Sequence, residues 1–260
     1  MNIDLHNHTT LCNHANGSME EYVTKAIEQK IDIFGFSEHA PMNFDQKYRM
    51  KMDDIEYYYT EILRLKEKYR NDIEIKYGYE VDYLPNFHEE SILCDKNIDY
   101  LIGSVHFLDS WGFDNPEFIG EYEKRDINQV HEEYYKTINA MAKSELFDIV
   151  GHLDLIKVFK FFPTKDMSEH IYEALKAIKN SGMVIEVNFA GMRKPIGQQY
   201  PSLDILELAF ELDIPITFGS DAHSVEQIGL NREKVYELIK AIGYTKAASF
   251  TNREMELYKF

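Results

Sequence analysis

Short apolar runs rich in β-branched residues alternate along this chain with longer segments whose apolar residues recur at helical spacing. Several of the runs are hydrophobic almost without interruption, which is typical of strands covered on both faces of a parallel sheet. The expected strands are residues 2–5, 31–37, 73–79, 98–104, 147–151, 183–188 and 214–219, with a weaker eighth candidate at 247–251.

The segments between these strands predict helices with recognisable ends. Ser18 and Glu21 have the spacing of a capping box, and Gly182 and Gly243 are placed where helices stop. The expected helices are residues 18–30, 53–70, 128–145, 168–180, 202–212 and 231–242. Strand and helix alternate about seven times, which predicts one α/β domain over residues 1–260, folded as a closed or nearly closed TIM-barrel-like (β/α) barrel.

Seven of the ten histidines lie at or just beyond the ends of apolar runs, together with Glu80 and Asp221. The carboxyl ends of the strands of such a barrel meet at one face, so these side chains are expected to converge there. A single histidine at a strand end is more often a surface residue, but the shared placement of seven favours a site. Clustered imidazoles and carboxylates are the ligands of hydrolytic sites with several metals. The predicted metal ligands are His6, His8, His14, His39, Glu80, His106, His152, Asp221 and His223.

The remaining three histidines, His88, His131 and His170, fall in a loop or on expected helices, where a solvent-facing histidine is common. Cys12 stands between His8 and His14 and is open to a nucleophile or ligand role, but we interpret it as a packed side chain, as we do Cys94.

Composition narrows the class of protein. The net charge of -17 weighs against a long nucleic acid as partner, because its phosphates would be repelled. No apolar stretch is long enough to span a membrane, and the N-terminus has no secretory signal. Two cysteines are too few for a disulfide-stapled scaffold, so a cytoplasmic setting is expected. Nothing in the sequence sets the oligomeric state.

Three basic residues are placed to bind an anion at the predicted site. Arg193 follows the sixth strand, Lys157 follows the fifth, and Arg49 lies in the loop after His39. A guanidinium fork suits a phosphate group, although a solvated surface charge is the alternative for each of them. Two long loops, 40–52 and 107–127, follow histidine motifs and are expected to form a lid or pocket wall.

These motifs resemble the polymerase-and-histidinol-phosphatase (PHP) family, in family order and over residues 4–223. The shared motifs are Asp4-Leu5-His6-Asn7-His8, Glu38-His39, Glu80, His106, Gly151-His152 and Asp221-Ala222-His223. Five longer stretches resemble the histidinol-phosphate phosphatase branch of this family in particular. They are Thr10-Leu11-Cys12-Asn13-His14-Ala15, Ser37-Glu38-His39-Ala40-Pro41, Gly103-Ser104-Val105-His106, Gly151-His152-Leu153-Asp154 and Asn188-Phe189-Ala190-Gly191-Met192-Arg193.

The resemblance implies a distorted (β/α)7 barrel with three divalent metal ions, which in the family are zinc, iron or manganese. Their implied ligand sets are His6, His8, Glu80 and Asp221 for the first, Glu80, His106 and His152 for the second, and His14, His39 and His223 for the third. It also implies hydrolysis of a small phosphate monoester, L-histidinol phosphate in histidine biosynthesis, by a metal-bridging hydroxide.

Asp221 and His223 are the candidate proton donors to the leaving alcohol. Asp221, or a metal-bound water, is preferred because a metal-bound histidine cannot easily donate a proton. Glu38, Asp82, Trp111 and Asp154 are predicted to contact the substrate amine and imidazole, or to orient the ligating imidazoles. Two alternatives stay open. One is a PHP phosphoesterase of other specificity, for phosphotyrosine or short oligonucleotides; the other is a non-catalytic metal-binding barrel.

Overall fold

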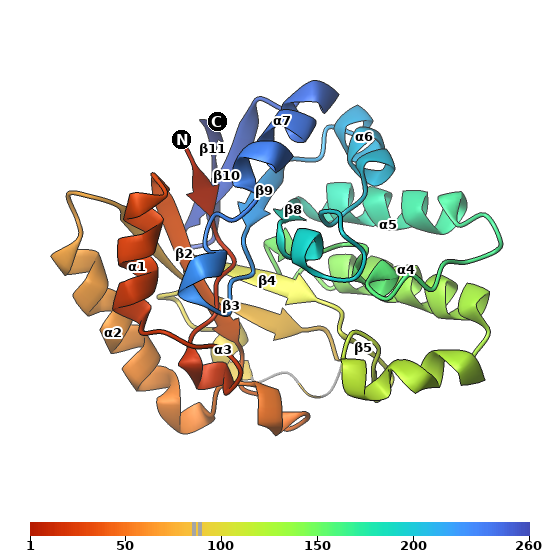
Figure 1. Ribbon diagram of the computed structural model, residues 1–260, viewed down its shortest axis with the longest axis horizontal. Helices are drawn as coiled ribbons and strands as arrows, with labels where there is room; N and C mark the ends of the chain where they lie inside the picture. Colours follow the sequence, from red (N-terminus) through yellow and green to blue (C-terminus); the bar gives the residue numbers. More distant parts are fainter. Residues whose placement is uncertain (85–86, 88–89) are drawn as a thin grey trace.

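Seven parallel strands in the computed structural model are neighbours in the order in which they occur along the chain (Figure 1). The structure describes residues 1–84, 87 and 90–260. Each strand returns through a connection on the outside, which is the way a (β/α) barrel is built. The strands are β1 (Ile3–Asp4), β2 (Ile33–His39), β3 (Glu74–Asp82), β4 (Tyr100–Ser104), β7 (Ile149–Val150), β8 (Val184–Asn188) and β9 (Ile216–Gly219).

Backbone hydrogen bonds between the first and last strands bring the barrel close to closure. The amide of Leu5 donates to the carbonyl of Phe218 at 2.9 Å, and the amide of His8 donates to that of Ala222 at 3.0 Å. Asn7 and Ala222 form a parallel bridge just beyond the two strands. The segments that carry the first and last histidine motifs are therefore held side by side.

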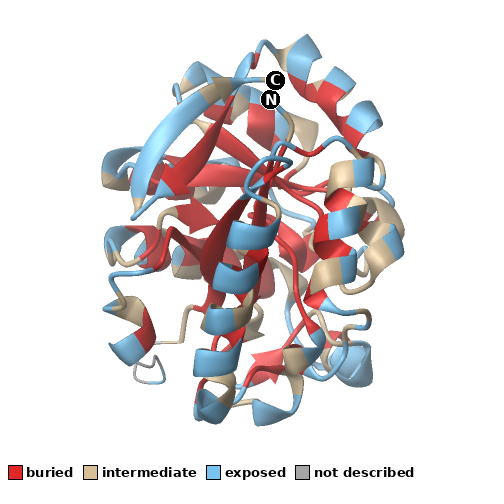
Figure 2. Ribbon diagram, turned by 90° about the vertical axis from the view of Figure 1, so that its left-hand side faces the viewer, coloured by how far each residue is buried: buried red, intermediate tan, exposed pale blue. Residues whose placement is uncertain are grey.

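The helices cover the outside of the barrel, with their exposed residues facing away from the buried strands (Figure 2). Ser18 and Glu21 form the predicted capping box, and Gly182 ends its helix with a positive φ of 75°. The helices are α1 (Met19–Glu28), α2 (Ile55–Lys68), α3 (Glu90–Leu93), α4 (Ile127–Lys143), α5 (Ser168–Ser181), α6 (Leu203–Glu211) and α7 (Arg232–Ile242). The 3-10 helices are η1 (Thr10–Cys12), η2 (Gln46–Tyr48), η3 (Met52–Asp54), η4 (Pro116–Lys124), η5 (Leu155–Lys157), η6 (Ala190–Arg193) and η7 (Val225–Gln227).

The Tyr100 side chain lies inside the barrel. The hydroxyl of Tyr100 donates to the carbonyls of Leu5 and Phe36, so its ring crosses the interior. A Cβ atom on Gly35 would lie 2.1 Å from the Tyr100 hydroxyl oxygen, and one on Gly78 would lie 2.7 Å from the ring carbon that bears it. Glycine at these two positions makes room for the ring.

The weak strand candidate at 247–251 is a strand, but it lies outside the barrel. It forms β10 (Lys246–Thr251), which pairs antiparallel with β11 (Glu254–Lys259) as a hairpin. The strand β11 is mostly exposed and lacks the apolar signal of the others. The two chain ends lie side by side (Figure 1), and the Met1 amino group donates a hydrogen bond to the Lys259 carbonyl.

The long loop after the fourth strand contains a small hairpin, β5 (Phe107–Leu108) with β6 (Trp111–Gly112), followed by η4. Among the described residues, no helix combines the length and apolar character needed to cross a bilayer.

Candidate metal centre

A pocket of about 540 Å³ opens at the carboxyl ends of the barrel strands and gathers most of the predicted ligands. Its lining includes seven of the nine: His14, His39, Glu80, His106, His152, Asp221 and His223. The other two, His6 and His8, are fully buried, with Nε2 atoms 3.4 and 3.5 Å from the Glu80 carboxylate that lines the pocket. The structure thus brings all nine side chains together, as the spacing predicts.

Glu80 lies at the centre of the cluster, and one of its carboxylate oxygens, Oε2, faces one group of predicted ligands. This atom, Oε2, is 3.4 Å from His6 Nε2, 3.5 Å from His8 Nε2 and 2.9 Å from His39 Nδ1. Asp221 Oδ1 completes this side, at 3.3 Å from His8 Nε2 and 3.9 Å from His6 Nε2.

The second oxygen of Glu80 faces a different pair of histidines. Oε1 lies 2.9 Å from His152 Nε2 and 3.6 Å from His106 Nε2, and it accepts a hydrogen bond from the Ser104 hydroxyl. A carboxylate whose two oxygens meet two separate donor sets has the geometry of a group shared between two cations. The second of these sets is the one that the family resemblance implies, whereas the first also contains His39, which the resemblance assigns to the third set and which lies closest to Oε2.

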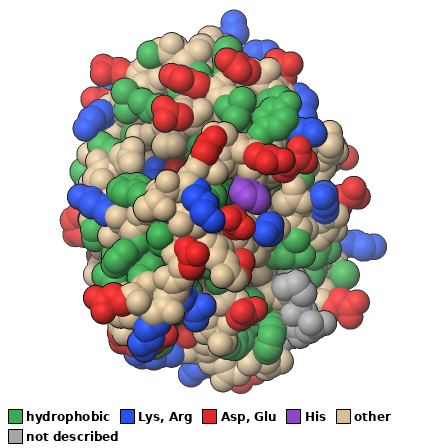
Figure 3. Space-filling model, turned by 90° about the vertical axis from the view of Figure 1, so that its right-hand side faces the viewer, with side chains coloured by type: hydrophobic (Ala, Val, Ile, Leu, Met, Phe, Trp, Pro, Cys, Tyr) green, Lys and Arg blue, Asp and Glu red, His purple; other side chains and the backbone are tan. Residues whose placement is uncertain are grey.

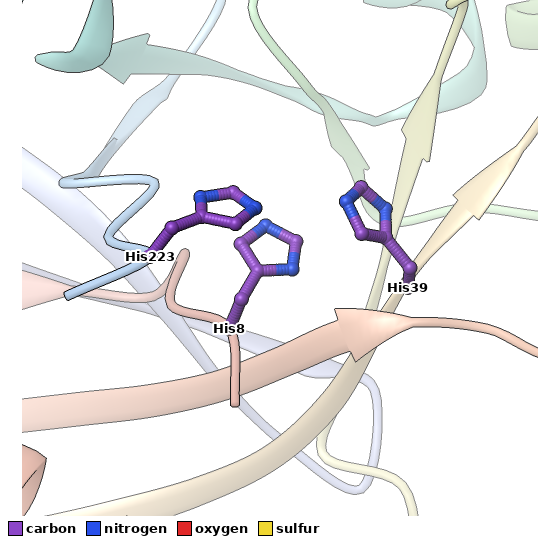
Figure 4. Close-up of side chains that lie close together, drawn as sticks. All are labelled: His8, His39 and His223. Carbon is purple, nitrogen blue, oxygen red and sulfur yellow. The ribbon is translucent and has the colours of Figure 1, made fainter. Parts of the chain in front are cut away.

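The third implied set is more diffuse. Figure 4 shows the rings of His8, His39 and His223 turned toward one another, and donor atoms of these three lie within 4.8 Å of one another. His14 instead groups with His223 and Cys12. The ring of His14 is nevertheless 4.5 Å from that of His223 and 5.5 Å from that of His39.

The hydrogen bonding of the buried imidazole nitrogens indicates whether metal ions fit the cluster. The Nε2 atoms of His6, His8 and His223 are buried without a hydrogen-bond partner in the described part of the chain. An unpaired buried polar atom costs free energy, and most such atoms have partners in native proteins. A cation supplies the missing partner to an imidazole nitrogen, so the donor set fits divalent metals such as zinc, iron or manganese.

Two predicted ligands have strained backbones. His152 has a φ of 24° and Asp221 a φ of 50°, in a region that residues other than glycine rarely adopt. The amide of His152 donates to a Glu186 carboxylate oxygen, and that of Asp221 donates to the His6 carbonyl. Such strain clusters at functional sites, where the surroundings hold it in place.

A ring of buried carboxylates orients the imidazoles from behind. Glu38 lies 3.3 Å from His8 Nδ1 and Asp82 lies 2.6 Å from His106 Nδ1, so these two predicted residues occupy orienting positions. Asp154 does not, because its carboxylate pairs with Lys157 and accepts from the Ser202 amide.

Glu186 was not predicted from the sequence. This fully buried residue of β8 places one oxygen 2.6 Å from His6 Nδ1, and the other accepts from the His152 amide at 2.8 Å. It therefore supports one ligand from each side of Glu80. The available signal was a lone acidic residue inside an otherwise apolar strand.

We expect Glu186→Gln to weaken zinc binding by about 10- to 100-fold, because it removes the charge that orients and polarises His6. Competition with a chelator of known affinity measures the change. Glu207→Gln, an exposed substitution on α6, serves as control and should leave the affinity unaltered. Equal zinc affinity in Glu186→Gln and the parent protein would remove this role.

The carboxylates also raise the pKa of individual imidazoles. Burial alone would lower the pKa of His8, but the nearby carboxylates of Asp221, Glu38 and Glu80 outweigh it and raise the pKa to about 9. Burial is likewise overcome at His106, where the charge of Asp82 helps raise the pKa to about 10. At neutral pH these two imidazoles hold protons that a metal must displace.

Metal binding near pH 7 is therefore expected to release about one proton or more per protein, and the affinity is expected to rise with pH. Protons compete with the metal for His8 at pH values below its pKa of about 9, and for His106 below its pKa of about 10. This competition weakens as the pH rises toward those values. Titration calorimetry in two buffers of different ionisation enthalpy counts the protons. An affinity that is constant between about pH 6 and 9 would contradict the assignment.

The predicted proton donors have pKa shifts that suit ligands better than acids. Burial would raise the pKa of Asp221, but attraction to His6 and to His8 holds it well below the usual range. Burial and repulsion from His8 place the pKa of His223 well below its ordinary value. A carboxylate that stays ionised and an imidazole that stays neutral are poor proton donors at neutral pH.

Two of the three predicted anion-binding residues line the pocket. Nη2 of Arg193 donates to the carbonyls of Ser220 and Asp221 at 2.9 and 3.1 Å, while Nη1 is buried with no hydrogen-bond partner in the described chain. Arg49 is fixed by a 2.9 Å bond to Asp82, so its main contact is with a carboxylate that orients a ligand.

The prediction for Lys157 is wrong in its placement. Its ammonium is buried, 2.7 Å from Asp154, and donates to the Gln199 carbonyl, and it is not part of the pocket lining. The side chain comes from the 3-10 helix η5, and its ammonium lies 5.3 Å from the centre of the Tyr200 ring. Lys194, which was not predicted, lines the pocket instead.

Several other predictions were corrected or confirmed. Trp111, a predicted substrate contact, is buried beside Arg125 and does not line the pocket. His131, which was expected to face solvent, is buried with its Nε2 atom 2.9 Å from the Phe161 carbonyl oxygen. His170 is partly exposed, and His88 lies outside the described residues. Cys94 is exposed, whereas Cys12 is buried as expected, and burial raises the pKa of its thiol.

Comparison with known proteins relates both the sequence and the fold to one family. The PHP domain model matches residues 4–190, and a PHP-associated model matches residues 204–237. A protein from Deinococcus radiodurans, named as a probable histidinol-phosphatase, is 35% identical over 97% of this chain and 98% of its own length. The histidinol-phosphatase of Bacillus subtilis is 33% identical over 90% of this chain and 98% of its own.

Solved structures are similar as well. A candidate histidinol phosphatase from Listeria monocytogenes, 30% identical, matches with a TM-score of 0.76 over 89% of this chain and 99% of its own. The histidinol phosphate phosphatase of Lactococcus lactis, solved with zinc, L-histidinol and phosphate, shares the fold at 23% identity with a TM-score of 0.85, over 98% of each chain.

Proposed function

The chain belongs to the PHP domain family, and on that premise we propose that it hydrolyses L-histidinol phosphate to L-histidinol and phosphate. The observation that carries the proposal is the pocket in which nine histidine, glutamate and aspartate side chains meet around Glu80. Relatives named as histidinol-phosphatases match this chain over nearly their whole length, which supports the choice of substrate.

The chain's own residues divide the work of phosphate ester hydrolysis. We propose that Glu80 and Asp221, with the clustered imidazoles, hold up to three divalent ions, and that Arg193 contributes a fixed positive charge to the phosphoryl group. Bound divalent metals supply Lewis-acid charge and a water that ionises near neutral pH. Arg193 lines the pocket beside Asp221, and its buried Nη1 has no hydrogen-bond partner in the described chain. Binding of a phosphoryl oxygen would give this N–H-bearing nitrogen a partner.

The alternatives are less well supported. An oligonucleotide would require a continuous basic surface, yet on the face in Figure 3 acidic and basic side chains are interspersed. A non-catalytic barrel has no need of an anion-binding arginine beside its metal ligands. A phosphotyrosine phosphatase differs only in the leaving group, so activity measurements must separate it.

A substrate panel tests the proposed function. Protein loaded with zinc, manganese or ferrous iron is assayed for phosphate release from L-histidinol phosphate, phosphotyrosine, a neutral alkyl phosphate and a short oligonucleotide. L-histidinol phosphate should have the highest kcat/KM, and a chelator should abolish turnover until metal is restored. A higher kcat/KM for phosphotyrosine would favour the other PHP specificity, and no turnover at full metal content would favour the non-catalytic barrel.

A further inference from the structure

The pocket has a second wall that faces the metal cluster and comes from the two long loops. The loop over residues 40–52 contributes Asp45, Tyr48 and Arg49. The loop over residues 107–127 contributes Phe107, Gly112, Asp114, Asn115, Pro116 and Phe118. Because the phosphoryl group belongs at the metals and Arg193, the alcohol part of a substrate must extend toward this wall.

Three carboxylates lie on this wall or at its base, and two of them already have cationic partners. Asp82 is bonded to Arg49 at 2.9 Å and to His106 at 2.6 Å. Asp45 lies 3.8 Å from the Arg49 guanidinium. Asp114 differs, because its carboxylate has no ion pair or hydrogen bond with any residue in the described ranges. It is the acidic group of this wall that is free to bind a cation.

Asp114 is also near the reacting end of the pocket. It interacts electrostatically with the imidazoles of His106 and His152 and with the ammonium of Lys194. Burial raises the pKa of Asp114, although its interactions with these three side chains oppose the rise. A partly buried carboxylate without a direct partner is stabilised when a cationic ligand pairs with it.

We propose that Asp114 binds the ammonium group of the leaving alcohol, which makes the enzyme selective for phosphate esters of amino alcohols. This inference rests on the proposed function. In L-histidinol phosphate the ammonium is on the carbon next to the ester carbon, so it must lie close to the metal end. A carboxylate beside His106 and His152 is in that region, whereas the aromatic rings of Phe107 and Phe118 are available to the rest of the alcohol.

The test compares L-histidinol phosphate with its analogue that lacks only the amino group, 3-(imidazol-4-yl)propyl phosphate. The metal-loaded parent protein should prefer the amine by about 10- to 100-fold in kcat/KM, the range for a charge-assisted hydrogen bond. Asp114→Asn should reduce this preference to about twofold or less, and Asp114→Glu, which keeps the charge, should retain part of it.

Glu117→Gln is the matched control, because it removes one negative charge from an exposed position of the same loop outside the pocket lining. It should retain the parent preference. An undiminished preference in Asp114→Asn, or an equal loss on both esters, would overturn the assignment. No hydrolysis of either ester by the metal-loaded parent protein would instead overturn the proposed function, which separates the two failures.

Discussion

Glu80→Ala is expected to leave fewer than three metal equivalents bound and to lower kcat/KM for L-histidinol phosphate by about 10³-fold or more. The reason is geometric. One oxygen of Glu80 faces His6, His8 and His39, and the other faces His106 and His152, so a single substitution removes a donor from both sides. Elemental analysis of the purified variant and initial rates at saturating metal measure the two effects.

The isosteric variant Glu80→Gln separates charge from shape. It keeps an oxygen and the hydrogen bond from Ser104 but loses the negative charge that offsets several cations. We expect it to bind less metal than the parent and more than Glu80→Ala. Glu207→Gln on the exposed face of α6 controls for expression and handling. Full metal occupancy in Glu80→Ala would rule out a shared ligand.

The barrel could be predicted from sequence because its strands are buried on both faces. Each of the seven apolar runs became a barrel strand, and the six expected helices begin and end within two residues of the prediction. The strand predictions were incomplete where a strand is buried on one face only or is exposed. β10 was expected as a possible eighth strand, but its antiparallel pairing with exposed β11 has no apolar signature.

The convergence of the nine candidate ligands could be predicted because most of them stand at fixed places relative to strand ends. Glu186 was missed because it lies inside β8, where a charged residue in an apolar run has no motif around it. Lys157 was wrongly placed because sequence spacing does not give the direction of the η5 turn, which pairs it with Asp154. Asp114 was missed because pocket walls built from long loops depend on tertiary packing.

Arg193 should be the most sensitive position for phosphate binding. Its Nη2 is occupied by the carbonyls of Ser220 and Asp221, and this anchors the guanidinium beside a predicted ligand. Its Nη1 is buried and has no hydrogen-bond partner among the described residues, so one N–H-bearing nitrogen remains without an acceptor. Burial lowers the pKa of Arg193, but from so high a value that the group stays charged at neutral pH.

Arg193→Ala is therefore expected to lower kcat/KM by about 10²- to 10³-fold and to weaken inhibition by inorganic phosphate, while metal content stays unchanged. Arg193→Lys should recover little of this loss, because one ammonium cannot hold two carbonyls and also reach a phosphoryl oxygen. Arg70→Ala, which removes an exposed arginine of the surface, is the control.

Metal content decides how the Arg193 result is interpreted. The guanidinium also supports the backbone of Asp221, so a structural role alone would release metal along with activity. Loss of activity with metals retained and phosphate inhibition weakened assigns Arg193 to the phosphoryl group. An unchanged kcat/KM would exclude Arg193 from the substrate site, and the charge on the phosphoryl group would then have to be met by Lys194 and the metals alone.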